Sequence, residues 1–197
     1  MNKQSLVPDT LVHLGQVILI GVFFGILVSI TAHLFVEGVK ALSGPRSVIA
    51  PINVGGINLH YAQIMTLSLA GFLIYLIKCG LGIGRWQGPA DTIFGAHRPD
   101  NELDVKIGLA STLAAFVSAS GGASVGQYGP LVHFGAVIGS AFKRFLRVKF
   151  STDVFIGCGV AAAISSGFGA PIAGVVFAHE AILRHFSLRA IAPIAIA

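Results

Sequence analysis

Charged residues are scarce in this chain. Its 197 residues include 13 Lys or Arg and 8 Asp or Glu, so that 11% are charged, whereas 54% are hydrophobic and the mean hydropathy is +0.83. A soluble globular domain carries about 25% charged residues, and this chain has too few of them to cover a folded core in water. The composition therefore predicts a protein of the lipid bilayer.

The basic excess is small and spread out. The formal net charge is +5, but the Lys and Arg residues lie in short loops between hydrophobic segments and are not gathered on one face, as nucleic-acid binding would require. We therefore expect no nucleic-acid partner. Cytoplasmic loops of membrane proteins are enriched in Lys and Arg. One set of loops is much the more basic, and we expect it to lie with the N-terminus in the cytoplasm, in a multi-pass protein of the plasma (bacterial inner) membrane: Lys78, Arg85, Arg98, Lys106, Lys143, Arg144, Arg147, Lys149, Arg184 and Arg189.

Residue patterns typical of enzymes and of metal sites are also missing. The two cysteines, Cys79 and Cys158, lie in apolar runs and are interpreted as small buried residues. No nucleophile–base pair or metal-ligand spacing occurs, and the one candidate phosphate loop lacks the Gly-Lys-Ser/Thr ending. The sequence therefore predicts no enzymatic activity, no cofactor and no metal. The first apolar run, residues 11–42, is too long for the core of a secretory signal, and we expect none.

Glycine and proline divide the apolar sequence into segments, most of them too short to cross a bilayer alone. The first, residues 11–42, is expected to end at Gly44-Pro45 and to be followed by a polar loop over residues 45–60. Ser151 is expected to cap a later helix. The pattern predicts helices over residues 11–42, 61–79, 89–96, 105–120, 129–146, 151–165, 171–185 and 188–197. We therefore expect an all-α polytopic membrane protein with broken, tilted helices, in which residues 1–197 form a single transmembrane domain.

A glycine-rich stretch over residues 121–136 runs directly into a helix start at Gly129-Pro130, and a shorter one over residues 84–89 does so at Gly88-Pro89. The N-terminus of a helix carries about +0.5 elementary charge and unsatisfied N–H groups, and broken helices at membrane depth mark binding sites. Two such ends at one point would hold a small anion without the excessive attraction of a Lys or Arg. The candidate anion-binding residues are Trp86, Gln87, Gly88, Gly126, Gln127, Tyr128, Gly129, Pro130 and Leu131.

Three stretches resemble the CLC family of chloride channels and anion/proton antiporters. Residues 126–136 resemble the family's Gly-Arg/Lys-Glu-Gly-Pro loop with its helix, and residues 159–177 with Glu180 resemble its small-residue run, Asn-Ala-Pro turn and following helix. Residues 84–89 lie where the family has Gly-Ser-Gly-Ile-Pro. The resemblance implies the N-terminal half of an inverted-repeat fold, which forms a homodimer with one pore in each subunit. It also implies that a C-terminal half, absent from this chain, is needed to complete the pore.

The chain departs from that family pattern at three positions. Tyr128 stands where the resemblance places the gating glutamate, Ala181 stands at the coupling position of the antiporters, and Trp86 replaces a serine that contacts the anion. A phenol stays neutral at pH 7 and does not compete with an anion as a carboxylate does. We therefore expect a chloride channel that passes ions by uncoupled diffusion, with Tyr128 as its gate.

Other interpretations stay open at this point. A proton-coupled chloride antiporter would use another titratable route, such as His133, His179 or Glu180, and a non-conducting half or assembly subunit would carry no ions. Tyr128 and Trp86 also fit interfacial aromatic residues, which are enriched at both faces of a bilayer. Glu180 matches a separate family glutamate and is interpreted as structural.

Overall fold

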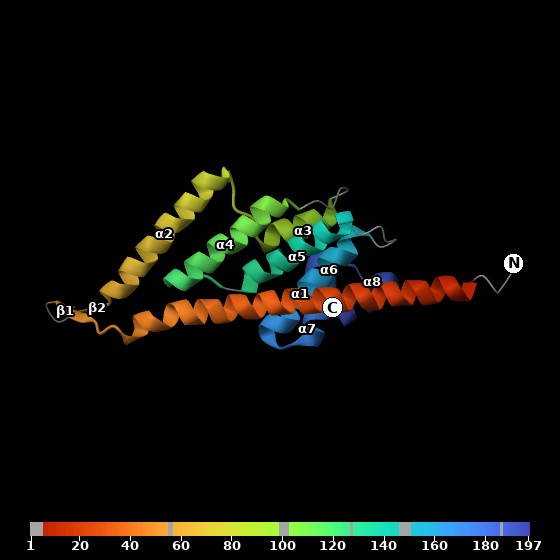
Figure 1. Ribbon diagram of the computed structural model, residues 1–197, viewed down its shortest axis with the longest axis horizontal. Coiled ribbons are helices and arrows are strands. Elements are labelled where there is room, and N and C mark those ends of the chain that lie inside the picture. The colour runs from red at the N-terminus through yellow and green to blue at the C-terminus, as the bar shows by residue number, and fades with distance from the viewer. Residues whose placement is uncertain (1–5, 55–56, 99–102, 127, 146–150, 186) are drawn as a thin grey trace.

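The computed structural model describes the chain except residues 1–5, 55–56, 99–102, 127, 146–150 and 186. Within the described residues the fold is helical apart from one short hairpin, and one long helix runs along most of the length of the molecule (Figure 1). The elements are α1 (Leu6–Val48), β1 (Ile52–Val54), β2 (Ile57–Leu59), α2 (Tyr61–Leu81), α3 (Pro89–His97), α4 (Val105–Gly121), α5 (Tyr128–Phe145), α6 (Thr152–Phe168), α7 (Pro171–Phe177), the π-helix η2 (Ala178–Leu183) and α8 (Leu188–Ile196).

Helix α1 continues past the point where the sequence predicted its end. Its 43 residues extend over about 65 Å, and Gly44-Pro45 lies within it instead of ending it. The expected loop over residues 45–60 is also wrong in part, because Ile52–Val54 and Ile57–Leu59 pair as an antiparallel hairpin.

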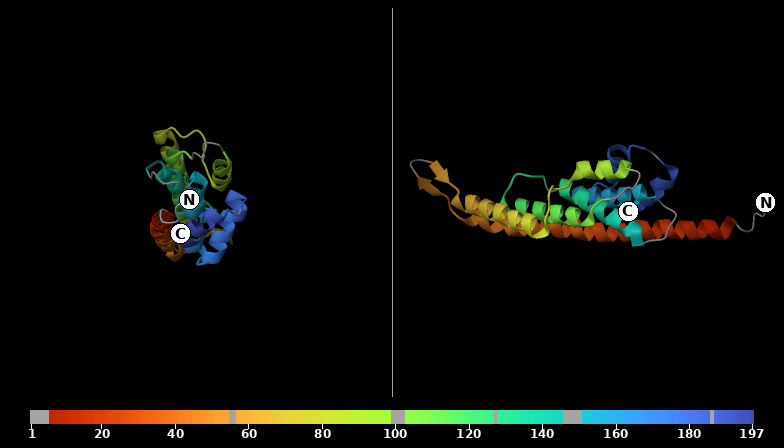
Figure 2. Two further views of the ribbon diagram at one scale, coloured as in Figure 1. Left: turned by 90° about the vertical axis from the view of Figure 1, so that its right-hand side faces the viewer. Right: turned by 90° about the horizontal axis from the view of Figure 1, so that it is seen from above.

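The core is built on α6, which is buried from Val154 to Ile164. Helix α5 packs so closely on α6 that a Cβ at Gly159 would collide with the carbonyl oxygen of Gly135. On its other side α6 meets α1, where the rings of Phe24 and Phe155 lie edge to face with centroids 5.8 Å apart. Seen end on, these helices form one bundle (Figure 2). Small residues along α5 and α6 therefore set the distance between the two helices.

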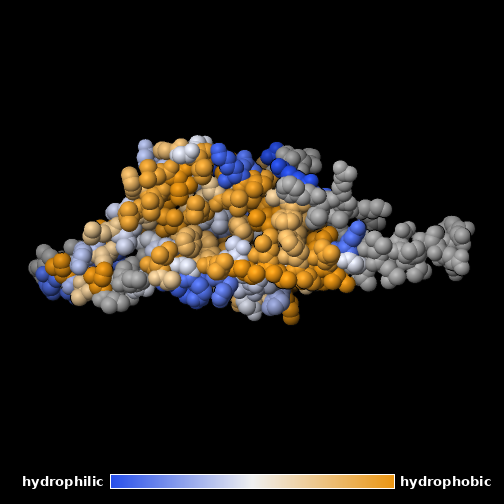
Figure 3. Space-filling model, in the orientation of Figure 1, coloured by the Kyte–Doolittle hydropathy of each residue, from blue (hydrophilic) through white to orange (hydrophobic). Residues whose placement is uncertain are grey.

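The surface is largely apolar. Two helical stretches are long and apolar enough to cross a membrane, Ile18–Gly44 and Tyr61–Leu81, and only 6% of the second is buried. Figure 3 shows hydrophobic residues over most of the visible face, with hydrophilic residues gathered at its margins. Exposed apolar side chains are stable in lipid and costly in water. Cys158 is buried as expected, but Cys79 is exposed on α2, so the prediction of two buried cysteines is half wrong.

The C-terminal third contains the expected breaks at slightly different residues. Helix α6 passes through Gly167 and ends at Phe168, and the next residue, Gly169, takes the left-handed conformation (φ 63°) that favours glycine. Ser151 precedes α6, but its side chain makes no capping hydrogen bond. The helix expected over residues 171–185 is instead the short α7 followed by the π-helix η2, which ends at Leu183. Such widened turns occur often at functional sites.

Candidate functional site

The start of α3 is held by its own side chains. Gly88 precedes Pro89, and the N–H of Gly88 donates to Oδ2 of Asp91 over 2.9 Å. The other carboxylate oxygen of Asp91 pairs with the guanidinium of Arg85. A carboxylate in the first turn is stabilised by the positive end of the helix. An acidic side chain therefore already occupies part of this N-terminus.

The segment before α3 borders a small cavity between α2, α4 and α5. The N–H of Gln87 donates to Oγ of Ser111 over 2.9 Å, which ties the segment to α4. The cavity measures about 270 Å³, and four of the predicted site residues line it: Trp86, Gln87, Gly126 and Pro130. The structure therefore brings together the two glycine-rich stretches that the sequence placed 40 residues apart.

The starts of α3 and α5 lie against each other. A Cβ at Gly129 would lie 3.4 Å from Cγ of Pro89, so the first turns of the two helices are in contact. One turn further in, Oγ1 of Thr92 on α3 and Nδ1 of His133 on α5 are 2.9 Å apart and both side chains are buried. This buried pair fixes the two helices relative to each other.

Tyr128 connects the start of α5 to a third broken point. Its ring stacks on that of Phe168, with centroids 4.1 Å apart and an interplanar angle of 29°. Phe168 is the last residue of α6, directly before the turn into α7. Stacked aromatic pairs are worth about 0.5–1.5 kcal/mol beyond the area that they bury. The phenol of Tyr128 is therefore positioned by Phe168, the residue directly before the break between α6 and α7.

The two helix starts differ in which backbone N–H groups remain for a ligand. Those of Gln87 and Gly88 already donate to Ser111 and Asp91, and their role in binding the anion stays a prediction. The N–H groups of Tyr128 and Gly129 make no hydrogen bond with any described residue, and the first N–H groups of a helix have no partner within it. The α5 start is therefore the more available donor site.

The other residues that the sequence analysis singled out differ in how deeply they are buried. Leu131 is 1% exposed and packs in the core, while Gln127 lies outside the described residues. Ala181 lies on η2, at half-buried depth, next to the buried His179. The side chain of Glu180 is exposed, and its interpretation as a structural glutamate stays a prediction.

Sequence reasoning missed Asp91, Ser111 and Phe168 as parts of the site. Asp91 had a usable signal, because an acidic residue three positions after a helix cap is a known capping arrangement. Ser111 and Phe168 carry no such local signal, since each reaches the site only through tertiary packing.

The fold and site together define a helical membrane protein whose broken helices bring two N-termini to one cavity. The family model described as voltage gated chloride channel matches residues 69–197, which is more than half of the chain. The chain belongs to this family, the CLC family, as its three motifs predicted.

Similar proteins carry chloride-channel names. A putative chloride channel protein ClcB-like of Ralstonia nicotianae is 29% identical over 140 residues, covering 68% of this chain and 33% of the relative. A voltage-gated ClC-type chloride channel ClcB of Yersinia pseudotuberculosis is 30% identical over 112 residues, covering 56% and 27%. The chloride channel protein A of Dictyostelium discoideum is 29% identical over 182 residues, covering 79% and 20%. The chain thus spans a third or less of the length of these curated relatives.

Proposed function

We propose that this chain forms the N-terminal half of a chloride pathway and that chloride passes along it by uncoupled diffusion. The observation that carries the proposal is the contact between the starts of α3 and α5, where Pro89 lies against Gly129 beside a cavity of about 270 Å³. The family and the chloride-channel names of its relatives support chloride as the ion. Because the chain spans only a third of those relatives, the rest of the pore would come from a C-terminal half, within a homodimer.

Backbone N–H groups and helix dipoles would bind the chloride ion. The N–H groups of Tyr128 and Gly129 donate to the anion, and the positive ends of α3 and α5 add a field that attracts it without binding it permanently. Gly126 and Gly129 leave room for the ion to approach the backbone closely. The family is one of channels and not of enzymes, and we assign no catalytic role to any of these residues.

Tyr128 would act as the gate. It stands at the start of α5, and its ring is stacked on Phe168, so a change in the stack would open or close the approach to the two N–H groups. Neither Tyr128 nor Ala181 carries a carboxylate, so these positions lack the titrating acid that couples protons to the anion. We therefore assign uncoupled transport, with the N-terminus and the basic loops on the cytoplasmic side.

One observation favours proton coupling as the second candidate. His133 is 1% exposed, and among the described residues its Nε2 has no hydrogen-bond partner. An imidazole can carry a proton, and this one is buried next to the proposed site. Glu180, in contrast, is exposed and offers no enclosed route.

The reversal potential distinguishes the two candidates. The chain is reconstituted with a C-terminal half in planar bilayers under a chloride gradient, first at equal pH and then with a pH gradient. Uncoupled diffusion keeps the reversal potential at the Nernst potential for chloride in both cases. A shift with the pH gradient that disappears in His133→Gln would overturn the proposal and establish coupling. An absence of current, and of chloride efflux from liposomes, would identify a non-conducting assembly subunit.

A further inference from the structure

Two neighbouring apolar cavities lie along α4. One measures about 340 Å³ and is lined by residues of α1 and α4 together with Phe134 of α5. The other measures about 210 Å³ and is lined by residues of α2 and α4 together with Leu42 of α1. Phe116 of α4 lines both cavities, so they adjoin at its ring, and together they are called the α4 groove. The anion pathway proposed above uses no residue of this groove.

Phe116 lies directly on α1. Its ring is edge to face with that of Phe35, with centroids 5.3 Å apart, and a Cβ at Gly38 would lie 2.9 Å from Cε2 of Phe116. Beside this contact, leucines of α1 and α4 stay largely exposed, 65% at Leu34 and 50% at Leu113. The groove is therefore accessible from outside the bundle.

The lining of the groove leaves no threonine hydroxyl in need of a ligand. Thr31 and Thr112 each donate to a backbone carbonyl of their own helix, over 2.9 and 3.0 Å. Thr66 donates to the carbonyl oxygen of Gly121 over 3.1 Å. Because a buried polar group needs a partner only when it lacks one, these hydroxyls place no polar demand on an occupant. The groove therefore suits a hydrocarbon chain.

The length of the groove matches one leaflet of a bilayer. Along α4 its lining runs from Leu109 to Gly121, which is about 18 Å of helix. The hydrocarbon core of a bilayer is about 30 Å thick, so that one leaflet takes about 15 Å. A single acyl chain laid along α4 would therefore fit the groove from end to end.

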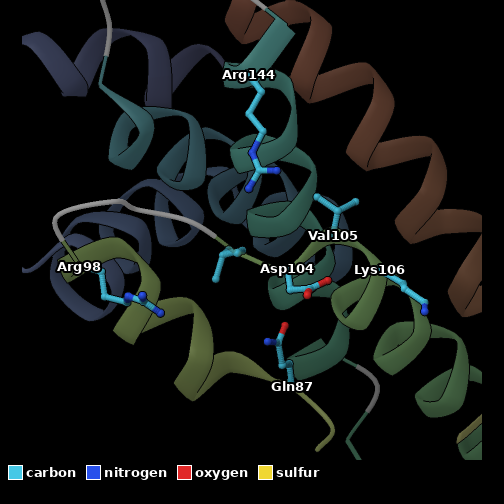
Figure 4. A pocket seen from close by; sticks show the side chains of 7 residues that line it. Gln87, Arg98, Asp104, Val105, Lys106 and Arg144 are labelled. Atoms are coloured by element: carbon cyan, nitrogen blue, oxygen red, sulfur yellow. The ribbon is translucent and has the colours of Figure 1, made fainter. Parts of the chain in front are cut away.

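A basic side chain stands at one end of the groove. Lys106 precedes Leu109 by three residues on α4, and residues at this spacing share one face of a helix. Its side chain is exposed and makes no ion pair or hydrogen bond with any described residue. Figure 4 shows Lys106 at the border of a separate polar cavity, with its ammonium group directed away from Arg98 and Arg144. The lysine is therefore available to a headgroup at the groove end.

Three acids precede this lysine in the sequence. Asp104 caps α4, with Oδ1 accepting the N–H of Ile107 over 3.0 Å. Asp100 and Glu102 lie outside the described residues. We therefore assign the headgroup contact to Lys106 alone and not to the net charge of this segment.

We propose that the α4 groove binds one acyl chain of an anionic phospholipid, whose phosphate lies at Lys106. In a bilayer, burial of apolar surface gives one lipid no advantage over its neighbours, so selectivity comes from the fit of the chain in the groove and from the charge of the headgroup. A lysine ammonium attracts a phosphate as a point charge. Lipid binding here does not depend on whether the chain conducts chloride.

Native mass spectrometry measures the binding. The full chain in uncharged detergent is titrated with phosphatidylglycerol, or with phosphatidylcholine that carries the same acyl chains. We expect phosphatidylglycerol to bind about fivefold more tightly, the worth of one lysine near an anionic headgroup. Lys106→Gln should remove this preference. Lys78→Gln removes the same charge in the last turn of α2; it is the matched control and should keep the preference.

A bulky side chain in the groove tests the acyl contact. Leu113→Trp fills part of the larger cavity, and we expect it to weaken the binding of both lipids about tenfold, the worth of roughly ten lost van der Waals contacts. Leu76→Trp is the control, because Leu76 on α2 is similarly exposed, at 47%, and lines neither cavity. Leu109→Trp, in the same cavity, takes the place of Leu113→Trp if the latter lacks a normal thermal unfolding curve.

Equal affinity for the two lipids in the unaltered chain would overturn the proposal. So would an equal loss of preference in Lys106→Gln and Lys78→Gln, or unchanged binding in the Trp variants of the groove. The titration is repeated after a C-terminal half is added: binding that persists supports a lipid in the groove, whereas binding that is abolished means that polypeptide covers it and overturns the proposal. No current or efflux is measured, so each of these results leaves the proposed chloride pathway untouched.

Discussion

The starts of α3 and α5 look alike in sequence and differ in the structure. Each follows a glycine-rich stretch, and each has Gly-Pro in its first turn or just before it. At α3 the N–H of Gly88 is taken by Asp91, which is itself paired with Arg85. At α5 no described residue accepts the N–H groups of Tyr128 or Gly129. Gly-Pro therefore places a helix start, but the nearest acid decides whether that start can bind an anion.

The contrast also concerns how each start is held in place. The segment before α3 is secured by a polar contact, from the N–H of Gln87 to Ser111. Helix α5 shares the Thr92–His133 pair with α3, but its start is secured by packing, with small residues against α6 and Tyr128 stacked on Phe168. A hydrogen bond that holds a helix start in place occupies a backbone N–H group, whereas side-chain packing leaves the backbone N–H groups available to a ligand.

The largest expected effect comes from breaking the packing that holds α5. In Gly159→Leu the new side chain would collide with the backbone of Gly135 on α5, and overpacking of this kind costs about 3 kcal/mol or more. We expect a strong fall in unfolding temperature and loss of any chloride efflux. Gly71→Leu on α2 is the control, since nothing lies within 4 Å of the position. An unchanged unfolding temperature in Gly159→Leu would contradict the close packing of α5 on α6.

Changes at Tyr128 test the proposed gate. Tyr128→Ala removes the ring that stacks on Phe168, and we expect chloride efflux from liposomes to rise about tenfold if the phenol blocks the path. Tyr128→Phe keeps the stack and loses only the hydroxyl, so its efflux should stay within about fivefold of the original, the worth of one hydrogen bond. Efflux that is equal in all three proteins would show that Tyr128 is only an interfacial aromatic residue.

The carboxylate of Asp91, at the start of α3, is changed in the third test. Asp91→Asn keeps an oxygen for the N–H of Gly88 but removes the negative charge from the helix start. A charge in the first turn of a helix is worth about 0.3–1 kcal/mol, and up to about 2 where it is partly buried. We expect chloride to bind about twofold to thirtyfold more tightly, measured by calorimetry. Asp153→Asn is the control, because Asp153 lies in the first turn of α6. An affinity that rises equally in both variants would reflect net charge alone.

Most of the fold could be predicted because it depends on local patterns. Apolar runs placed the helices, and Pro89, Gly129 and Pro171 marked the breaks within a few residues. The end of α1 was misplaced because Gly-Pro usually marks the end of a helix, whereas α1 continues through it to Val48. The hairpin after α1 is three residues on each strand, too short to show a clear alternation.

The site was predictable only in part, because its geometry depends on distant pairs. The motifs placed a helix start at Gly129-Pro130, within two residues of the observed start at Tyr128. No local pattern states that Pro89 lies against Gly129 or Phe168 against Tyr128. Thr92 and His133 are separated by 41 residues, and each is unremarkable in its own segment. Single-sequence patterns therefore identify helix ends but do not say which of their N–H groups remain available.

The smallest effect is expected at Ser111, where a hydrogen bond holds the segment before α3 to α4. Ser111→Ala removes the hydroxyl that accepts the N–H of Gln87 over 2.9 Å. The loss costs about 1 kcal/mol of stability, but it also returns one N–H to the cavity beside Gly126. We therefore expect a slightly lower unfolding temperature together with chloride binding that is equal or tighter. Ser68→Ala, on the exposed face of α2, removes a hydroxyl that bonds only its own helix, and should leave chloride binding unchanged. Weaker chloride binding in Ser111→Ala alone would mean that the order of the segment before α3 matters more than its free donors, and the contrast between the two helix starts would then rest on rigidity.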